Sequence, residues 1–198
     1  NVVDITNYIV HAFGQPLHCF DADKIEGGEV VVKTMPEGTP FVTLDGVERK
    51  LSDRDLMICD KEKPMCIAGV FGGLDSGSTE TTKDVFIESA YFHPTWVRKT
   101  ARRHGLNTDA SFRFERGIDP NITIYCLKLA AMMAKELAGG TISSEIKDVC
   151  AAPAQDFIVE LSYEKVYSLV GKVIPVETIK SIVTSLEMKI TNETAEGL

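Results

Sequence analysis

Two ionisable side chains stand inside apolar stretches of the sequence, where either could take part in chemistry. Glu88 interrupts the run VFIESAYF, and His18 lies in QPLHCFD. An acid in such a run either lies on the wet face of a strand or costs free energy unless a group donates a hydrogen bond to it. A buried Glu88 could therefore accept a hydrogen bond from a ligand hydroxyl. For His18, a hydrogen-bonded packing role is the commoner outcome, and a site role stays open.

Glycines and cations form further candidate features. AGVFGG, residues 68–73, lacks the G-x-G-x-x-G spacing that opens a dinucleotide-binding helix, so it is either a glycine turn or a wall that faces a ligand. RRHGLNTDASFRFERG, residues 102–117, surrounds small residues with five cationic side chains, as a solvated loop or a stretch shaped to hold a ligand. A solvated helix face or a small phosphate-facing patch are the alternatives for Arg98, Lys99, Arg102 and Arg103.

Metal and nucleophilic catalysis are disfavoured. The four histidines, at positions 11, 18, 93 and 104, show no H-x-x-x-H or H-x-E grouping, so we expect no metal site. The five cysteines are odd in number and scattered, which indicates neither a disulfide framework nor a C-x-x-C pair. Ser89 and Ser111 lack the context of a nucleophile elbow. Any hydrolysis would use water directly.

Composition limits the class of protein. The chain has 198 residues, of which 44% are hydrophobic and 25% charged, as in an ordinary globular protein. The sequence has neither an apolar run of membrane-spanning length, nor a signal pattern, nor an initiator Met, and we expect a cytoplasmic piece of a longer protein with no membrane partner. The net charge of -8 disfavours a self-sufficient nucleic-acid binder, because such proteins neutralise phosphates with Lys and Arg.

The first half of the chain combines helix and strand patterns. Apolar residues at helical spacing predict a helix from the N-cap Asp4 to Gly14. Residues 29–60 predict strands, with Asp45-Gly46 as a tight hairpin turn. We expect MCIAGVFGG and VFIESAYF to form strands, followed by a short basic helix to about His104.

The second half predicts a long helix and then a change of domain. Asp119 and Pro120 should open an amphipathic helix that ends at Gly139-Gly140. TISSEIKDV predicts a closing strand, and residues 151–156 have the composition of a linker. Residues 157–198 predict strand, short helix, second helix and strand start. The expected fold is α+β, a β-rich core flanked by helices, followed by a truncated, winged-helix-like α/β unit.

Six segments, in order, carry a family resemblance: VVDITNYI, GQPLHCFD, LDG, AGVFGG, VFIESAYF and RRHGLNTDASFRFERGIDP. Together they resemble the editing domain of the bacterial phenylalanyl-tRNA synthetase beta subunit. The resemblance implies a tRNA-editing domain over residues 1–150 and, over residues 157–198, the start of the subunit's next domain.

The resemblance also implies an activity, hydrolysis of tyrosine wrongly attached to phenylalanine tRNA. Glu88 would accept a hydrogen bond from the tyrosine hydroxyl, and His18, the catalytic candidate, would orient the water or the ester. Gly72 and Ala110 would leave space for the aromatic ring. Polar groups for the amino-acid end or an ordered water would come from Thr6, Asn7 and Thr108.

Partners and cofactors follow from the same resemblance. The domain would bind the 3′ end of phenylalanine tRNA carrying tyrosine, and the parent enzyme would pair with a synthetase alpha subunit in a heterotetramer. This fragment would need no cofactor, whereas the parent enzyme would use ATP and Mg. The alternative is a non-catalytic module that positions tRNA or assists assembly.

Overall fold

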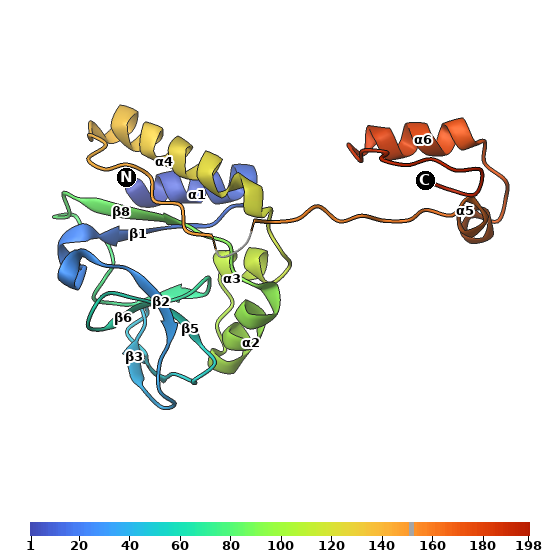
Figure 1. Ribbon diagram of the computed structural model, residues 1–198. Coiled ribbons are helices and arrows are strands. Elements are labelled where there is room, and N and C mark those ends of the chain that lie inside the picture. The colour runs from blue at the N-terminus through green and yellow to red at the C-terminus, as the bar shows by residue number, and fades with distance from the viewer. Residues whose placement is uncertain (151–152) are drawn as a thin grey trace. The chain divides into compact units, whose positions relative to one another are not determined.

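The computed structural model describes residues 1–150 and 153–198 and divides into two compact units, Asn1–Ala152 and Pro153–Leu198 (Figure 1). Residues 151 and 152, at the start of the expected linker, lie outside the described residues. The first unit combines antiparallel sheets with helices, which confirms the α+β class.

One layer of the first unit is a two-stranded ribbon covered by two helices. Strand β1 (Leu17–Asp21) pairs antiparallel with β8 (Val85–Ser89), and helices α1 (Val2–Phe13) and α4 (Thr123–Ala138) pack against it (Figure 1). A small core closes this layer, formed by Ile5, Ile9, Cys126 and Ala130 with Leu17 and Ile87 packed against them.

Helix α1 begins three residues earlier than the sequence predicted. Its N-cap is Asn1, whose side chain accepts hydrogen bonds from the N–H groups of Val3 and Asp4. Asp4 was expected as the N-cap, but it completes a capping box from the third helical position. The helix ends at Gly14 as expected, in the left-handed conformation that glycine adopts without strain.

The second layer is a four-stranded sheet in the order β2-β5-β6-β7. Its strands are β2 (Val31–Thr34), β5 (Leu56–Cys59), β6 (Pro64–Ile67) and β7 (Phe71–Gly72). A separate hairpin pairs β3 (Pro40–Val42) with β4 (Glu48–Lys50). The main core includes residues of β5 and β6 and Phe20 of the ribbon.

The expected strand MCIAGVFGG is interrupted. It forms β6 and β7, joined by a turn in which Gly69 has φ +67°. A Cβ on Gly69 would lie 2.9 Å from the Phe92 ring, so both the backbone conformation and the packing require glycine there. The prediction of one continuous strand was therefore wrong, because apolar composition does not reveal a turn inside the run.

The cationic stretch 102–117 is mostly helical. It contains the end of α2 (Pro94–His104), a short connection, and α3 (Asp109–Phe114). His93 caps α2 and Thr108 caps α3. Short 3-10 helices complete this unit at Ala22–Lys24, Glu26–Gly28 and Pro120–Ile122.

Two predicted strands are not formed. Residues 141–149, the expected closing strand, have no regular structure, and their apolar residues Ile142, Ile146 and Val149 are exposed. In the second unit, residues 157–161 have no strand, and an isolated bridge joins Ser162 to Gly197 beside helices α5 (Tyr163–Val170) and α6 (Val176–Ser185). A strand needs a partner edge: residues 141–149 pair with no strand among the described residues, and in the second segment pairing is limited to Leu161, which exchanges backbone hydrogen bonds with Leu198.

Candidate functional site

The register of the β1–β8 ribbon places His18 directly opposite Glu88. Side chains alternate between the two faces of a strand. Leu17 and Ile87 pack with the cluster of α1 and α4, so His18 and Glu88 lie on the other face, with Phe20 of the main core. The two ionisable residues that the sequence singled out, 70 positions apart, therefore form one cross-strand pair.

His18 presents an unused nitrogen to this face. Its Nε2 is buried and makes no hydrogen bond to any described residue. The ring packs edge-on against Phe20, with centroids 4.4 Å apart. Because burial disfavours the charged form, it lowers the pKa of His18 to about 4. The imidazole is thus neutral at pH 7 and can accept or donate a hydrogen bond.

The pKa of Glu88 is shifted in the opposite direction to that of His18. Within the described part of the chain its carboxyl group has no hydrogen bond or ion pair, and burial raises the pKa of Glu88 to about 7. By surface area both residues of the pair are half-buried, while their titrating groups are densely surrounded by protein. The pKa of Cys66, on β6, is also raised, by burial first and by the Glu88 charge second.

Gly72 and Leu44 form a wall beside His18. A Cβ on Gly72 would lie 3.0 Å from His18 Cε1 and 2.9 Å from Leu44 Cδ1. Leu44 also covers Gly77, where an added Cβ would lie 3.3 Å from Leu44 Cδ2. The Leu44 N–H donates to the Gly72 carbonyl at 3.0 Å, which fixes the hairpin against β7.

Leu44 was not among the predicted site residues. Its side chain is 44% exposed, although it lies next to a glycine and a buried histidine nitrogen. The available signal was its place in LDG, immediately before the hairpin turn Asp45-Gly46. Sequence spacing alone could not show that this turn folds over residue 72.

Thr108 and Ala110 occupy the start of α3. The Thr108 hydroxyl donates to the Val70 carbonyl at 2.8 Å and accepts from the Ser111 N–H at 3.0 Å. Ala110 packs against the main core. Since Val70 directly precedes β7, these two residues lie close to the strand that ends at Gly72. The Thr108 hydroxyl proton is already used within the protein, which leaves its oxygen as an acceptor.

Thr6 and Asn7 are placed differently. Both belong to α1, which packs on the ribbon face opposite to His18. The Thr6 hydroxyl donates to the Val3 carbonyl at 2.9 Å, and Asn7 is exposed. No hydrogen bond between described residues joins either of them to His18 or Glu88. The structure brings His18, Glu88 and Gly72 together, and the roles of Thr6 and Asn7 stay predictions.

Comparison with known proteins assigns the chain to a protein family. The model of the B3/4 domain family matches residues 1–139. The chain belongs to the B3/4 domain family. This B3/4 domain chain is 91% identical over 198 residues to the phenylalanine–tRNA ligase beta subunit of Bacteroides fragilis and 87% identical to that of Bacteroides thetaiotaomicron. It is 58% identical over 194 residues to that of Porphyromonas gingivalis.

The predicted resemblance to the beta subunit is thus confirmed. The chain spans 24% of the length of each of these relatives. A fragment of the phenylalanyl-tRNA synthetase beta subunit from Pyrococcus horikoshii is a weaker match, with a TM-score of 0.41 and 15% identity over 99% of this chain and 57% of that one. The family membership rests on the sequence comparisons.

Three arginines of residues 102–117 make contacts within the B3/4 domain. Arg103 pairs with the fully buried Asp55, which also accepts from Thr100 at 2.9 Å and lies 2.7 Å from His104 Nε2. Arg113 pairs with Asp109 at 3.2 Å, and the Arg116 guanidinium lies 3.5 Å from the centroid of the Phe112 ring. This cationic stretch is thus largely tied to its own neighbours.

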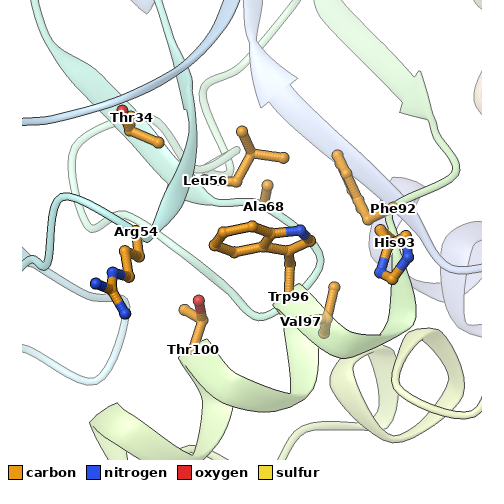
Figure 2. A pocket seen from close by; sticks show the side chains of 9 residues that line it. All are labelled: Thr34, Arg54, Leu56, Ala68, Phe92, His93, Trp96, Val97 and Thr100. Atoms are coloured by element: carbon orange, nitrogen blue, oxygen red, sulfur yellow. The ribbon is translucent and has the colours of Figure 1, made fainter.

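Two cavities of the B3/4 domain lie away from the His18–Glu88 pair. One, of about 340 Å³, is bordered by α3 and the end of α1; the other, of about 220 Å³, lies against α2 (Figure 2). Among the described residues no group of three or more His, Cys, Asp or Glu side chains could hold a metal ion. No helix over the described ranges is long and apolar enough to cross a membrane.

Proposed function

We propose that this B3/4 domain hydrolyses the ester between tyrosine and phenylalanine tRNA, an editing reaction. The observation that carries the proposal is the Glu88 carboxyl group, unpartnered among the described residues, opposite the free Nε2 of His18. In the parent protein, the domain would act beside a phenylalanine–tRNA ligase that uses ATP and Mg and pairs with an alpha subunit.

Discrimination would depend on the hydroxyl that distinguishes tyrosine from phenylalanine. A tyrosine ring directed at Glu88 donates its phenolic proton to the carboxyl oxygen. A phenylalanine ring in the same place shields the carboxyl group from water and offers no donor, at a cost of about 1–3 kcal/mol. A site built around such a polar group rejects the analogue that lacks the hydroxyl far better than an apolar pocket rejects the extra hydroxyl.

The chemical step needs only water. Its oxygen attacks the ester carbonyl carbon, the ribose oxygen leaves with a proton, and free tyrosine and uncharged tRNA result. The neutral His18 imidazole, with Nε2 free, can accept a hydrogen bond from that water and orient it. Since its pKa is about 4, His18 is a weak base, and we assign it a role in orientation. Gly72, Ala110 and Leu44 would contact the ring, and Thr108 the amino-acid end. The family resemblance gives Thr6 and Asn7 the same role as Thr108, although α1 packs on the other face of the ribbon.

The test compares release of tyrosine and of phenylalanine from phenylalanine tRNA, using the chain and its Glu88→Ala variant. We expect the wild type to release tyrosine faster, and Glu88→Ala to lose tyrosine release selectively. The matched control is Glu136→Ala, an exposed acid on α4, which should behave as the wild type. Equal loss for both amino acids would contradict a hydroxyl-reading Glu88. Intact mischarged tRNA with salt-sensitive binding would instead support a positioning module.

A further inference from the structure

A second candidate binding site lies between helix α2 and the four-stranded sheet. The cavity there has a volume of about 220 Å³. Its lining comes from α2, from the strand ends of β2 and β5, and from the turn after β6: Thr34, Arg54, Leu56, Ala68, Phe92, His93, Trp96, Val97 and Thr100. Figure 2 shows the indole of Trp96 across the middle of this cavity, between Arg54 and His93. None of the residues proposed for the editing pocket lines it.

Trp96 is the residue of this cavity best suited to contact a ligand. Its side chain is 49% exposed, whereas the neighbouring Phe92 and Val97 are buried and form an apolar floor. Other aromatic rings of the chain are as exposed, but Trp96 lies beside an apolar hollow, so a planar group could both stack on the indole and fill the hollow. The hollow and the ring together suit a planar group that stacks on the indole.

The charges around the cavity indicate the kind of planar group. The Arg54 side chain is 74% exposed, and the carboxylate paired with it, that of Asp53, lies 4.0 Å away and is itself 64% exposed. Such a pair is weak in water. Arg98, Lys99 and Arg102 do not line the cavity, but they are exposed on the same helix as Trp96, and that helix contains no acid.

The acids near Arg54 belong to segments other than α2. Glu37 accepts from the Asp53 N–H at 2.9 Å and keeps its charge, because hydrogen bonds lower its pKa, and the buried Asp55 is paired with Arg103. In a chain of net charge -8, the surface of α2 is therefore a local concentration of positive charge with an exposed indole in it.

A stacking ring beside exposed cations is the combination that binds single-stranded nucleic acid: bases stack on aromatic side chains, and cations meet the phosphates. An apolar peptide would fill the hollow but leave the cations unused. We propose that Trp96 and Arg54 form a subsite for an unpaired nucleotide of RNA, with the base stacked on the indole and the phosphate near Arg54 and α2.

This subsite would extend the proposed function. It rests on that function in one respect, because we take the bound strand to be the 3′ end of the edited tRNA. One short segment touches both places: Ala68 lines the cavity, Val70 holds Thr108, and Gly72 abuts His18. The cavity at Trp96 and the wall of the proposed editing pocket thus share the segment 68–72.

The test exploits the fact that Trp96 is the single tryptophan of the chain. Titration of the chain with the single-stranded RNA ACCA should quench tryptophan fluorescence to saturation. The same strand with abasic positions should quench far less, and added salt should weaken binding. With a labelled strand, Trp96→Ala should weaken binding about tenfold and Arg54→Gln severalfold. The conservative Trp96→Tyr should retain most of the affinity.

Matched controls come from exposed residues elsewhere, Tyr8→Ala on α1 and Lys128→Gln on α4, which should bind as the wild type. Absence of quenching, or equal quenching by the abasic strand, would overturn the proposal. Quenching by an apolar peptide but not by RNA would overturn it in favour of a protein-docking site. None of these readouts measures ester hydrolysis. Failure of editing with Trp96 quenching intact would contradict the proposed function alone, and editing without quenching would contradict this subsite alone.

Discussion

Two inward-facing carboxyl groups of this B3/4 domain have opposite environments. Asp55 is fully buried and accepts hydrogen bonds from the Ser52 N–H at 2.8 Å and from Thr100, with Arg103 and His104 beside it. Burial alone would raise the pKa of Asp55, but hydrogen bonds, from Ser52 first and then from His104 and Thr100, outweigh it and hold the pKa below its usual value.

Glu88 is less buried by surface area, yet burial raises its pKa to about 7, because no described residue donates to it. Burial raises the pKa of both carboxyl groups, and only Asp55 has donors among the described residues that outweigh it. A satisfied acid such as Asp55 holds the fold together. An unsatisfied one such as Glu88 weakens the fold and is available to a ligand.

The largest effect should come from removing the satisfied acid. Asp55→Ala leaves Thr100, His104 and Arg103 without their partner, and we expect it to lower the free energy of unfolding by about 2–4 kcal/mol. Urea denaturation measures this change. Asp53→Ala, at an exposed neighbouring position, should change stability by less than about 0.5 kcal/mol. Similar values for the two variants would remove the contrast between Asp55 and Glu88.

Removing the unsatisfied charge of Glu88 should raise the free energy of unfolding, whereas removing Asp55 lowers it. The folded state holds the Glu88 proton more tightly than the unfolded chain, so stability falls as pH rises from 4.5, the ordinary pKa of a glutamate, to about 7 and stays lower above it. Glu88→Gln should therefore raise the free energy of unfolding at pH 8 by about 1–3 kcal/mol and leave it nearly unchanged at pH 4. Denaturation curves at both pH values measure this difference.

His18 provides an internal check on that pH profile. Burial lowers its pKa to about 4, so His18 destabilises the folded state as pH falls below 6.5. In the Glu88→Gln variant, the loss of stability below pH 6.5 should remain, and the loss of stability above pH 4.5 should disappear. A profile identical to that of the wild type would mean that Glu88 is not desolvated.

Gly72→Ala should disturb the wall that Gly72 and Leu44 form beside His18. The added Cβ would crowd His18 and Leu44, since their nearest atoms would lie 3.0 and 2.9 Å away. We expect a loss of about 1–2 kcal/mol of stability and a loss of tyrosine release. The double variant Gly72→Ala, Leu44→Ala should recover stability, because the leucine is the movable neighbour. No recovery would show that His18 is the obstacle.

The smallest effect on stability should come from Leu44→Ala. The side chain is 44% exposed, so its truncation should cost less than about 1 kcal/mol. Tyrosine release should still fall severalfold if Leu44 contacts the ring, as measured by deacylation of mischarged tRNA. Val47→Ala, a comparably exposed apolar residue in the same hairpin, is the control and should leave release unchanged.

Much of the local structure followed from sequence pattern. The Ile5–Ile9 spacing and Gly14 predicted α1, and Asp45-Gly46 predicted the β3–β4 hairpin. Predictions failed where structure depends on a partner. The turn at Gly69 divides an apolar run that looked continuous. Residues 141–149 have the composition of a strand but, in the described part of the chain, no neighbouring strand to pair with, which composition does not reveal.

The sequence by itself determined which residue types were available for chemistry: an acid and a histidine in apolar strands, glycines, a cationic stretch, and the motifs that identify the family. Only the tertiary structure decided their partners. The antiparallel register sets His18 against Glu88, and the folded hairpin brings Leu44 over Gly72. A pKa depends on the water and donors that distant segments exclude or supply, so no reading of neighbours along the chain could distinguish Glu88 from Asp55.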